Sequence, residues 1–459
     1  MADVTPIKTA AEQQIAAEWQ GAKERLPGAS ALRAAAFERF AESGLPHQRV
    51  EEWKYTNLRA LMRDAKPLAS PPDAQAKARA RAAGKVLADV ESRRLVFVDG
   101  IFVPELSQLE ALEPGLTIQS MAAALAAGDP LVTARLGKVV PADDVAVALN
   151  TAFMGDGAVI RVAAGATLER PLHLVFAASG DKPAAIFTRS LVVIEKGARV
   201  MLVESHEGLG GQRAAGAGTG DYQVNTAVEL VVGDDAHVDH VKITDEAASA
   251  LHISSLMAAL GAHARFNTFG FTTGGAVVRN QLFIRFDGEG TIAGIGGASL
   301  VKDRQHVDTT LVAEHAAGGC QSRELFKSVL DEHARSVFQG KIIVQPHAQK
   351  TDAKMATHAL LLSETAEADN KPELEIFADD VQCGHGATAG ALDETLLFYL
   401  KARGIPPKEA EALLIQAFVG EAVEGIEHAG LREALIEAVV GWLTARAARA
   451  EAPPRAARG

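Results

Sequence analysis

The spacing of apolar residues divides the chain into a helical beginning, a long middle of short strands and a helical end. Near the N-terminus, Ile15, Trp19 and Ala22 recur at spacings of four and three, which places them on one face of a helix. The same period returns in residues 30–43 and stops at Gly44, a residue type that commonly ends helices. Two amphipathic helices are therefore predicted in the first 44 residues.

Residues 74–103 combine a helical stretch with a hairpin. Ala, Lys and Arg predominate from Ala74 to Val90, which predicts a third helix. Two short apolar runs then flank Asp99 and Gly100, and an Asp-Gly pair between apolar runs is typical of a tight β-hairpin turn.

From Gly155 to Val344 the pattern changes to short apolar strands separated by turns of two to four residues. The first four intervals between turn markers are 32, 36, 28 and 27 residues, and the last is 43. Similar units at a regular spacing are typical of a solenoid, and no helical period interrupts these strands. We therefore predict a mainly β protein with a β-helix core, and a two-sheet β-sandwich is the alternative. The turn markers are Gly165, Gly197, Gly233, Gly261, Gly288 and Asp331.

Helical periodicity returns after residue 390. Asp393 is suited to cap a helix that Gly404 ends, and two further apolar-periodic stretches follow. Helices here would cover the last strands, whose unpaired edges need a cap or a partner. The predicted organisation is an N-terminal helical region with a short hairpin (1–110), a β-helix core (111–390), a C-terminal helical region (391–450) and a mobile tail (451–459).

Composition and charge narrow the classes of function. The 459 residues carry a formal net charge of −12, which argues against nucleic acid or an anionic membrane surface as the main partner. We expect neither a signal peptide nor a membrane span, because the N-terminus lacks a charged segment before an apolar one and long apolar windows are absent. Cys320 and Cys383 are the only cysteines and form no CxxC, so a cytoplasmic protein without a structural disulfide is expected.

The motifs of nucleotide chemistry are missing from the sequence. The chain lacks GxxxxGK[ST], and its glycine-rich stretches do not open a helix after a strand, which argues against a P-loop ATPase and against dinucleotide binding. Two cysteines are also too few to hold an iron–sulfur cluster unaided, because such clusters normally take four thiolates.

Three residues in the last third are candidates for metal chemistry. Cys383 and His385 are one residue apart on a predicted strand, so both side chains point to the same face and can contact one ion. A packed thiol beside a structural imidazole is the alternative for this pair. His358 enters an apolar run, where a core imidazole is the alternative to a ligand.

Three long motifs resemble the SufB/SufD family of iron–sulfur cluster assembly proteins. They are "EEWKYTNLRAL" near the N-terminus, "QKTDAKMATHALLLSETAEADNKPELEIFADDVQCGHGATAG", and "LFYLKARGIPPKEAEALLIQAF" in the C-terminal region. The resemblance extends from about residue 46 to residue 425, and the last block is similar to the SufD branch of the family.

The resemblance implies a right-handed parallel β-helix between helical ends and a heterodimer with SufB. It also implies that an ATPase, SufC, docks on the C-terminal helical region, which agrees with the missing P-loop. The chain is then a scaffold subunit and not an enzyme, and whether it forms a homodimer in isolation stays open. The expected docking residues are Asp393, Phe398, Tyr399, Leu413 and Phe418.

The resemblance also assigns roles to the candidate ligands. No permanently bound cofactor is expected, only transient iron or an iron–sulfur cluster shared with SufB. His385 is the main ligand implied, with Cys383 and His358 as further candidates. Where SufB has His-Glu-Ala-Thr, this chain has Gly386 in place of the glutamate, and His358 lies near the position of the SufB cysteine. Both differences favour an assisting subunit that aids iron acquisition.

Two alternatives of other classes remain at this point. One is a β-helix enzyme that acts on carbohydrates, although such proteins are usually exported. The other is a purely structural adaptor that organises SufB and SufC without any chemistry at His385. A SufB protein itself is disfavoured by the missing glutamate and cysteine.

Overall fold

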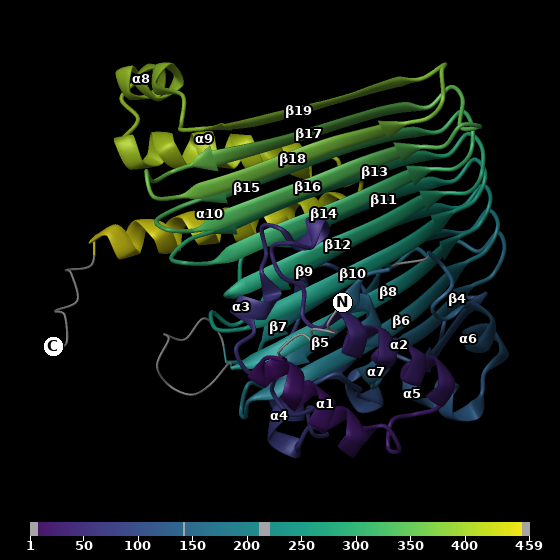
Figure 1. Cartoon of the computed structure of the whole chain (residues 1–459). Coiled ribbons are helices and arrows are strands. Elements are labelled where there is room, and N and C mark those ends of the chain that lie inside the picture. The colour runs from purple at the N-terminus through teal and green to yellow at the C-terminus, as the bar shows by residue number, and fades with distance from the viewer. Residues whose placement is uncertain (1–7, 141–142, 211–220, 452–459) are drawn as a thin grey trace, which may run out of the picture.

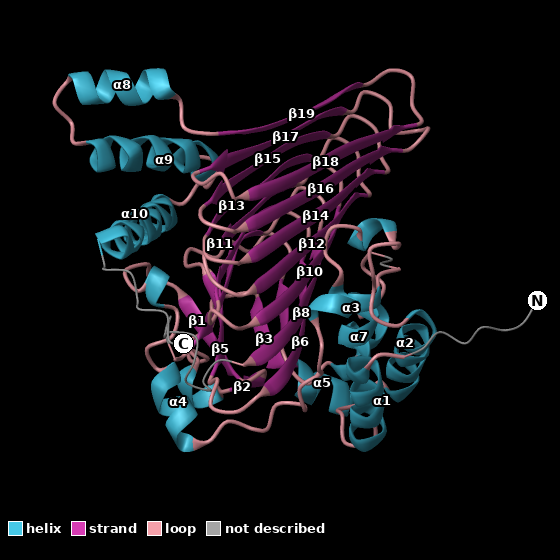
Figure 2. Ribbon diagram, turned by 60° about the vertical axis from the view of Figure 1, so that its left-hand side comes forward, coloured by secondary structure: helices cyan, strands magenta, loops and turns pink. Residues whose placement is uncertain are grey.

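The computed structural model describes residues 8–140, 143–210 and 221–451. Its body is a parallel β-solenoid flattened into two facing sheets, with helices along both outer faces (Figures 1 and 2). From β4 onward consecutive strands alternate between the sheets, and each of β6 to β17 pairs with the strand two positions before it and the strand two positions after it along the chain. The prediction of a mainly β, helix-flanked solenoid is confirmed, and the β-sandwich alternative is wrong.

The ten-stranded sheet has the order β19-β17-β15-β13-β11-β9-β7-β5-β1-β2, and the nine-stranded sheet has the order β18-β16-β14-β12-β10-β8-β6-β4-β3. The strands are β1 Arg93–Val98, β2 Ile101–Phe102, β3 Leu116–Ser120, β4 Ala158–Val162, β5 Leu172–Ala178, β6 Ala184–Ile194, β7 Arg199–Gly208, β8 Tyr222–Val232, β9 His237–Asp245, β10 Leu251–Leu260, β11 Arg265–Thr272, β12 Val277–Phe286, β13 Ile292–Val301, β14 His306–His315, β15 Gln321–Leu330, β16 Arg335–Val344, β17 Asp352–Leu361, β18 Glu367–Ile376 and β19 Gln382–Gly390. The helices are α1 Ala10–Ala22, α2 Ser30–Ser43, α3 Leu58–Leu61, α4 Ala74–Ala80, α5 Met121–Ala127, α6 Pro130–Arg135, α7 Val145–Phe153, α8 Glu394–Ala402, α9 Pro407–Val423 and α10 Ala429–Glu451.

The repeat inferred from turn markers is correct for most of its length and wrong at one point. Gly197, Gly233, Gly261 and Gly288 all lie where the chain crosses from the nine-stranded to the ten-stranded sheet. Asp331 lies between β15 and β16, at the opposite crossing. The interval of 43 residues therefore joins turns from the two sides of the solenoid and is not a period of the repeat.

The N-terminal predictions are confirmed except for one helix. Ile15, Trp19 and Ala22 are buried on α1, and β1 pairs with β2 in an antiparallel hairpin around Asp99 and Gly100, both at positive φ. The helix predicted from Ala74 to Val90 is wrong beyond Ala80.

A tertiary contact explains this shorter helix. Gly84 has a φ of +76°, and its N–H donates to the half-buried carboxylate of Glu207 on β7. That contact holds the backbone of Gly84 outside the helical region, so only a short 3₁₀ turn follows, at Lys85–Leu87.

Helices cover the two sheets on opposite sides, as Figure 2 shows. α1, α2 and α7 form an apolar cluster with Leu251 and Ile253 of the nine-stranded sheet. α9 and α10 pack against outward-facing residues of the ten-stranded sheet, among them Val329 and Leu360. The predicted mobile tail, apart from Glu451, lies outside the described residues. Within the described part of the chain, no helix has the length and apolarity needed to cross a membrane.

Candidate functional site

The solenoid ends in two open edges. β18 is the last strand of one sheet and β19 is the last strand of the other, and within the described part of the chain each pairs on one side only, with β16 and β17. An edge of this kind presents free backbone N–H and C=O groups to any strand that approaches. The edge of β19 is also lined by small side chains, since its sequence is QCGHGATAG.

Packing within the chain does not account for the glycines of β19. A Cβ atom added at Gly384, Gly386 or Gly390 would meet no described atom within 4 Å. Each of these positions therefore has room for a side chain in this structure. Small residues at an open edge are suited to the close approach of another polypeptide.

Cys383 and His385 lie on the face of β19 that continues the solenoid interior. Their partners in register on β17 are Ala353 and Met355, both buried in the main core. His385 is exposed because no later coil covers it, and Cys383 is half-buried. The prediction that these two side chains share a face is confirmed.

The thiol of Cys383 is held in its protonated form. Burial raises its pKa, and the carboxylates of Asp352 and Glu324 raise it further. A protonated thiol is a poor metal ligand and a poor nucleophile. Cys383 is thus less suited than His385 to bind an ion in the isolated chain.

His358 is placed on the opposite face of the sheet. It lies in register with Thr388 of β19, and its Nδ1 is 2.7 Å from the Thr388 hydroxyl. Burial lowers the pKa of His358, and the nearby ammonium of Lys327 lowers it further. The structure therefore brings Cys383 and His385 together and separates His358 from both.

Glu324 on β15 is a residue of this region that the sequence prediction missed. It is in register with Met355, which is in register with His385, so all three lie on the interior face of the ten-stranded sheet. Glu324 is 2% exposed, and neither carboxylate oxygen has a hydrogen-bond partner among the described residues. Burial raises its pKa to about 7. The sequence did offer one indication: Ser322, Glu324 and Phe326 alternate along a strand, which places all three on its inward face.

The C-terminal helices carry a separate apolar patch. Phe398, Tyr399 and Leu413 are exposed, and α8 has only exposed or half-buried side chains. In Figure 2, α8 lies on α9, beyond the end of the sheets. Asp393 has a structural role here, since its Oδ1 accepts hydrogen bonds from the N–H groups of Thr395 and Leu396.

Phe418 differs from the other predicted docking residues. It packs against the cluster beneath α9, and the Nζ of Lys327 lies 4.5 Å from the centroid of its ring. Phe418 therefore helps to attach α9 to the ten-stranded sheet.

Two family models match the chain. The SufBD core domain of SUF system FeS cluster assembly matches residues 176–418, and the SufBD protein N-terminal region matches residues 21–174. The chain belongs to the SufBD family. The resemblance inferred from the motifs is thereby confirmed, and the chain is a SufBD-family iron–sulfur cluster assembly protein.

Individual SufBD relatives are similar over most of their length. A SufBD family protein of Synechocystis is 33% identical over 398 residues, covering 86% of this chain and 87% of the relative. The iron–sulfur cluster assembly protein SufD of Escherichia coli is 29% identical, covering 87% and 89%. SufD of Bacillus subtilis is 25% identical, covering 89% and 92%.

Proposed function

We propose that this SufBD-family chain is the non-ATPase subunit of an iron–sulfur cluster assembly scaffold. It pairs with SufB through the open edges of β18 and β19, aids iron acquisition, and helps build a transient cluster at that interface. The observation that carries the proposal is the position of His385, which is exposed on a strand with one open edge, lined by glycines that packing among the described residues does not require.

The chemistry of the end residues supports a shared site. A neutral imidazole binds ferrous iron without adding negative charge, which suits a site from which the cluster must later leave. The Cys383 thiol is protonated, and Cys320, the other cysteine, is buried in the core, so the remaining sulfur ligands would come from the partner. Iron is here a cargo of the complex and not a resident cofactor.

Replacement of His385 by Ala tests the proposal. In a complex assembled with SufB and SufC, His385→Ala should leave the subunit composition unchanged, because the side chain is exposed. Iron and sulfide bound after anaerobic reconstitution should fall several-fold. His333→Ala, which removes an exposed histidine from the turn between β15 and β16, is the matched control. Normal cluster formation in an intact His385→Ala complex would refute the ligand role and favour the structural adaptor.

The apolar patch on α8 is the proposed docking surface for SufC. Phe398 is 70% exposed and Tyr399 is 53% exposed, and α8 covers little of the solenoid. Phe398→Ser should weaken SufC binding about tenfold or more, as removal of a central aromatic contact commonly does. The melting temperature of the chain should not change. Val440→Ser, an exposed position on α10, is the control, and equal SufC binding by both variants would contradict the assignment.

A further inference from the structure

A cluster of buried ionisable residues lies inside the solenoid, away from the open edges. One potential ligand atom each of His206, Glu246 and His252 lies within 4.8 Å of the other two, and all three residues are buried. His206 comes from β7 and His252 from β10, so the two histidines belong to different sheets. Glu246 directly follows β9. Two imidazoles and one carboxylate form a common ligand set for zinc and for non-haem iron.

One distance within the cluster is close to the spacing of two ligands on a single small ion. The Nδ1 of His252 is 2.9 Å from Oε1 of Glu246. Two ligand atoms bound tetrahedrally at about 2 Å from one ion lie roughly 3.3 Å apart. The two groups therefore need only a few tenths of an ångström of adjustment to bind the same ion.

The surrounding residues already hold the ligands in place. The hydroxyl of Tyr222 donates to Oε2 of Glu246 over 2.6 Å, and Oε2 of Glu204 lies 3.4 Å from Nε2 of His206. The His206 ring also stacks on Phe176 with centroids 4.6 Å apart. Carboxylates and hydroxyls that orient the ligating groups are typical of protein metal sites.

Charged groups also flank the cluster. Oε1 of Glu204 is 2.9 Å from Nε2 of His240, and the ammonium of Lys242 is 3.2 Å from Nε2 of His252.

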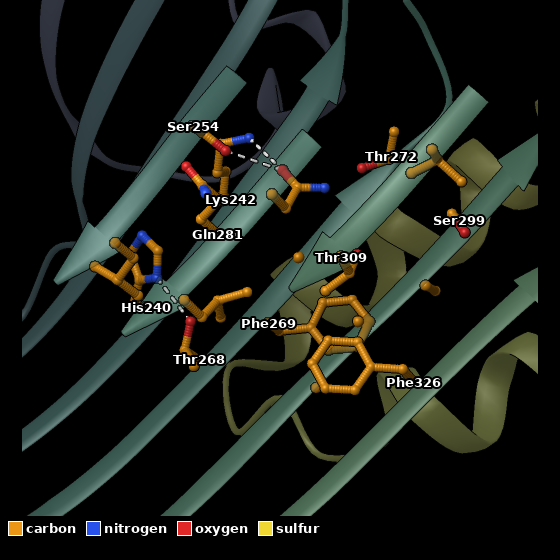
Figure 3. Close-up of a pocket in the computed structure, with 18 of the residues that line it drawn as sticks. His240, Lys242, Ser254, Thr268, Phe269, Thr272, Gln281, Ser299, Thr309 and Phe326 are labelled. Atoms are coloured by element: carbon orange, nitrogen blue, oxygen red, sulfur yellow. Dashed lines mark hydrogen bonds between the residues drawn. The ribbon is translucent and has the colours of Figure 1, made fainter. Parts of the chain in front are cut away.

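A cavity of about 60 Å³ lies beside two residues that flank the cluster. Glu204 and Lys242 line it, together with His240, Ser254 and Thr268, and Figure 3 shows the last three and Lys242 gathered there. This volume has room for a few water molecules and is too small for a nucleotide or an organic coenzyme. The cavity therefore offers space for water beside the cluster, and the three ligands themselves do not line it.

We propose that His206, Glu246 and His252 bind one divalent transition-metal ion, zinc or ferrous iron, as a resident site inside the solenoid. The site differs from the proposed interface site, because neither Cys383 nor His385 takes part. It also differs from the sequence-based expectation that the chain holds no permanent metal.

Cobalt titration of the full-length chain tests the site directly. After removal of metals with a chelator, Co²⁺ is added anaerobically as a spectroscopic substitute for zinc and iron. One equivalent should give visible bands of a four- or five-coordinate ion without a thiolate-to-cobalt charge-transfer band, and Zn²⁺ should abolish these bands. Absence of a stoichiometric spectrum would overturn the proposal. A thiolate band would do the same, because it would locate the ion at Cys320 or Cys383.

Variants with opposite expected effects separate ligand loss from misfolding. Glu246→Gln and His252→Asn should each lower Zn²⁺ affinity more than tenfold. His173→Asn removes a buried imidazole that lies 2.8 Å from the Ser205 hydroxyl and is not part of the cluster, so it should leave the affinity unchanged. Lys242→Met should raise it about tenfold or more, since its ammonium lies 3.2 Å from Nε2 of His252 and repels a dication. A misfolded variant cannot gain affinity. A lower Zn²⁺ affinity in Lys242→Met would therefore overturn the assignment, and so would a loss of affinity in His173→Asn as large as in Glu246→Gln and His252→Asn.

Discussion

At the scale of single residues, Glu324 near the open end lies in surroundings that disfavour the charged form of its carboxylate. Burial raises its pKa from 4.5 to about 7. Between these two pH values the folded chain keeps a proton that the unfolded chain has lost. The free energy of unfolding therefore falls as pH rises through this window, by about 3 kcal/mol in total at full effect.

Glu324→Gln removes this ionisation. The variant should match the wild type near pH 4.5 and exceed its unfolding free energy by about 3 kcal/mol at pH 8, where the wild-type carboxylate is charged. Urea denaturation at both pH values measures the difference. Glu433→Gln, an exposed position on α10, is the control. A difference between Glu324→Gln and the wild type that does not depend on pH would contradict the buried, unpaired state of this carboxylate.

The candidate site was predictable from the sequence only in its local part. Cys383 and His385 share a face because strand alternation is a property of neighbouring residues. Glu324 joins them through two successive strand pairings, more than 50 residues away along the chain. Such pairings depend on the length of every intervening turn. The same reason explains why the separation of His358 from His385 was not foreseen.

At the scale of elements, the segment around Trp53 fixes the N-terminal region to the nine-stranded sheet. The guanidinium carbon of Arg279 lies 3.8 Å from the ring centroid of Trp53, and the indole N–H donates to Asp144 over 2.9 Å. Arg279 also donates to the carbonyl oxygen of Glu52 and pairs with the buried carboxylate of Asp308. The motif "EEWKYTNL" is therefore an anchor that closes one outer face of the solenoid.

Trp53→Ala should destabilise the chain by about 3–5 kcal/mol, because it leaves a cavity over a buried guanidinium. Trp53→Phe should destabilise the chain less than Trp53→Ala, since it keeps an aromatic face for Arg279 and mainly loses the hydrogen bond to Asp144. Denaturant unfolding measures both, and Leu61→Ala, at a 41% exposed position, is the control. Equal effects of Trp53→Ala and Leu61→Ala would show that the segment does not anchor the region.

The elements that local sequence determines were predicted well. The Asp99-Gly100 hairpin needs only its own turn residues and the apolar runs beside them. The prediction of one helix from Ala74 to Val90 was wrong because the N–H of Gly84 donates to Glu207. This contact joins residues more than 100 positions apart in the sequence. Asp331 was assigned to the wrong series because turns at the two sides of a solenoid have similar composition.

At the scale of the whole molecule, the solenoid has one end covered and one end open. The N-terminal hairpin and the antiparallel strand β3 form the first edges, where helices and loops gather. The last edges are β18 and β19, and in Figure 1 β19 lies beyond α9 and α10 while β18 lies level with α9. A molecule of this shape has one end open to a second chain, which the proposed pairing with SufB requires.

Hydrogen exchange of this chain, alone and in complex with SufB, tests that claim most directly. Gly386→Val is the matched variant, since a Cβ atom at this position meets no described atom within 4 Å. We predict that backbone amides of residues 367–376 and 382–390 become protected in the complex, while those of β2 and β3 at the other end do not change. Gly386→Val should keep its stability alone and lose most of the added protection. If the amides of β18 and β19 exchange equally fast with and without SufB in a complex that has formed, the open end is not the interface.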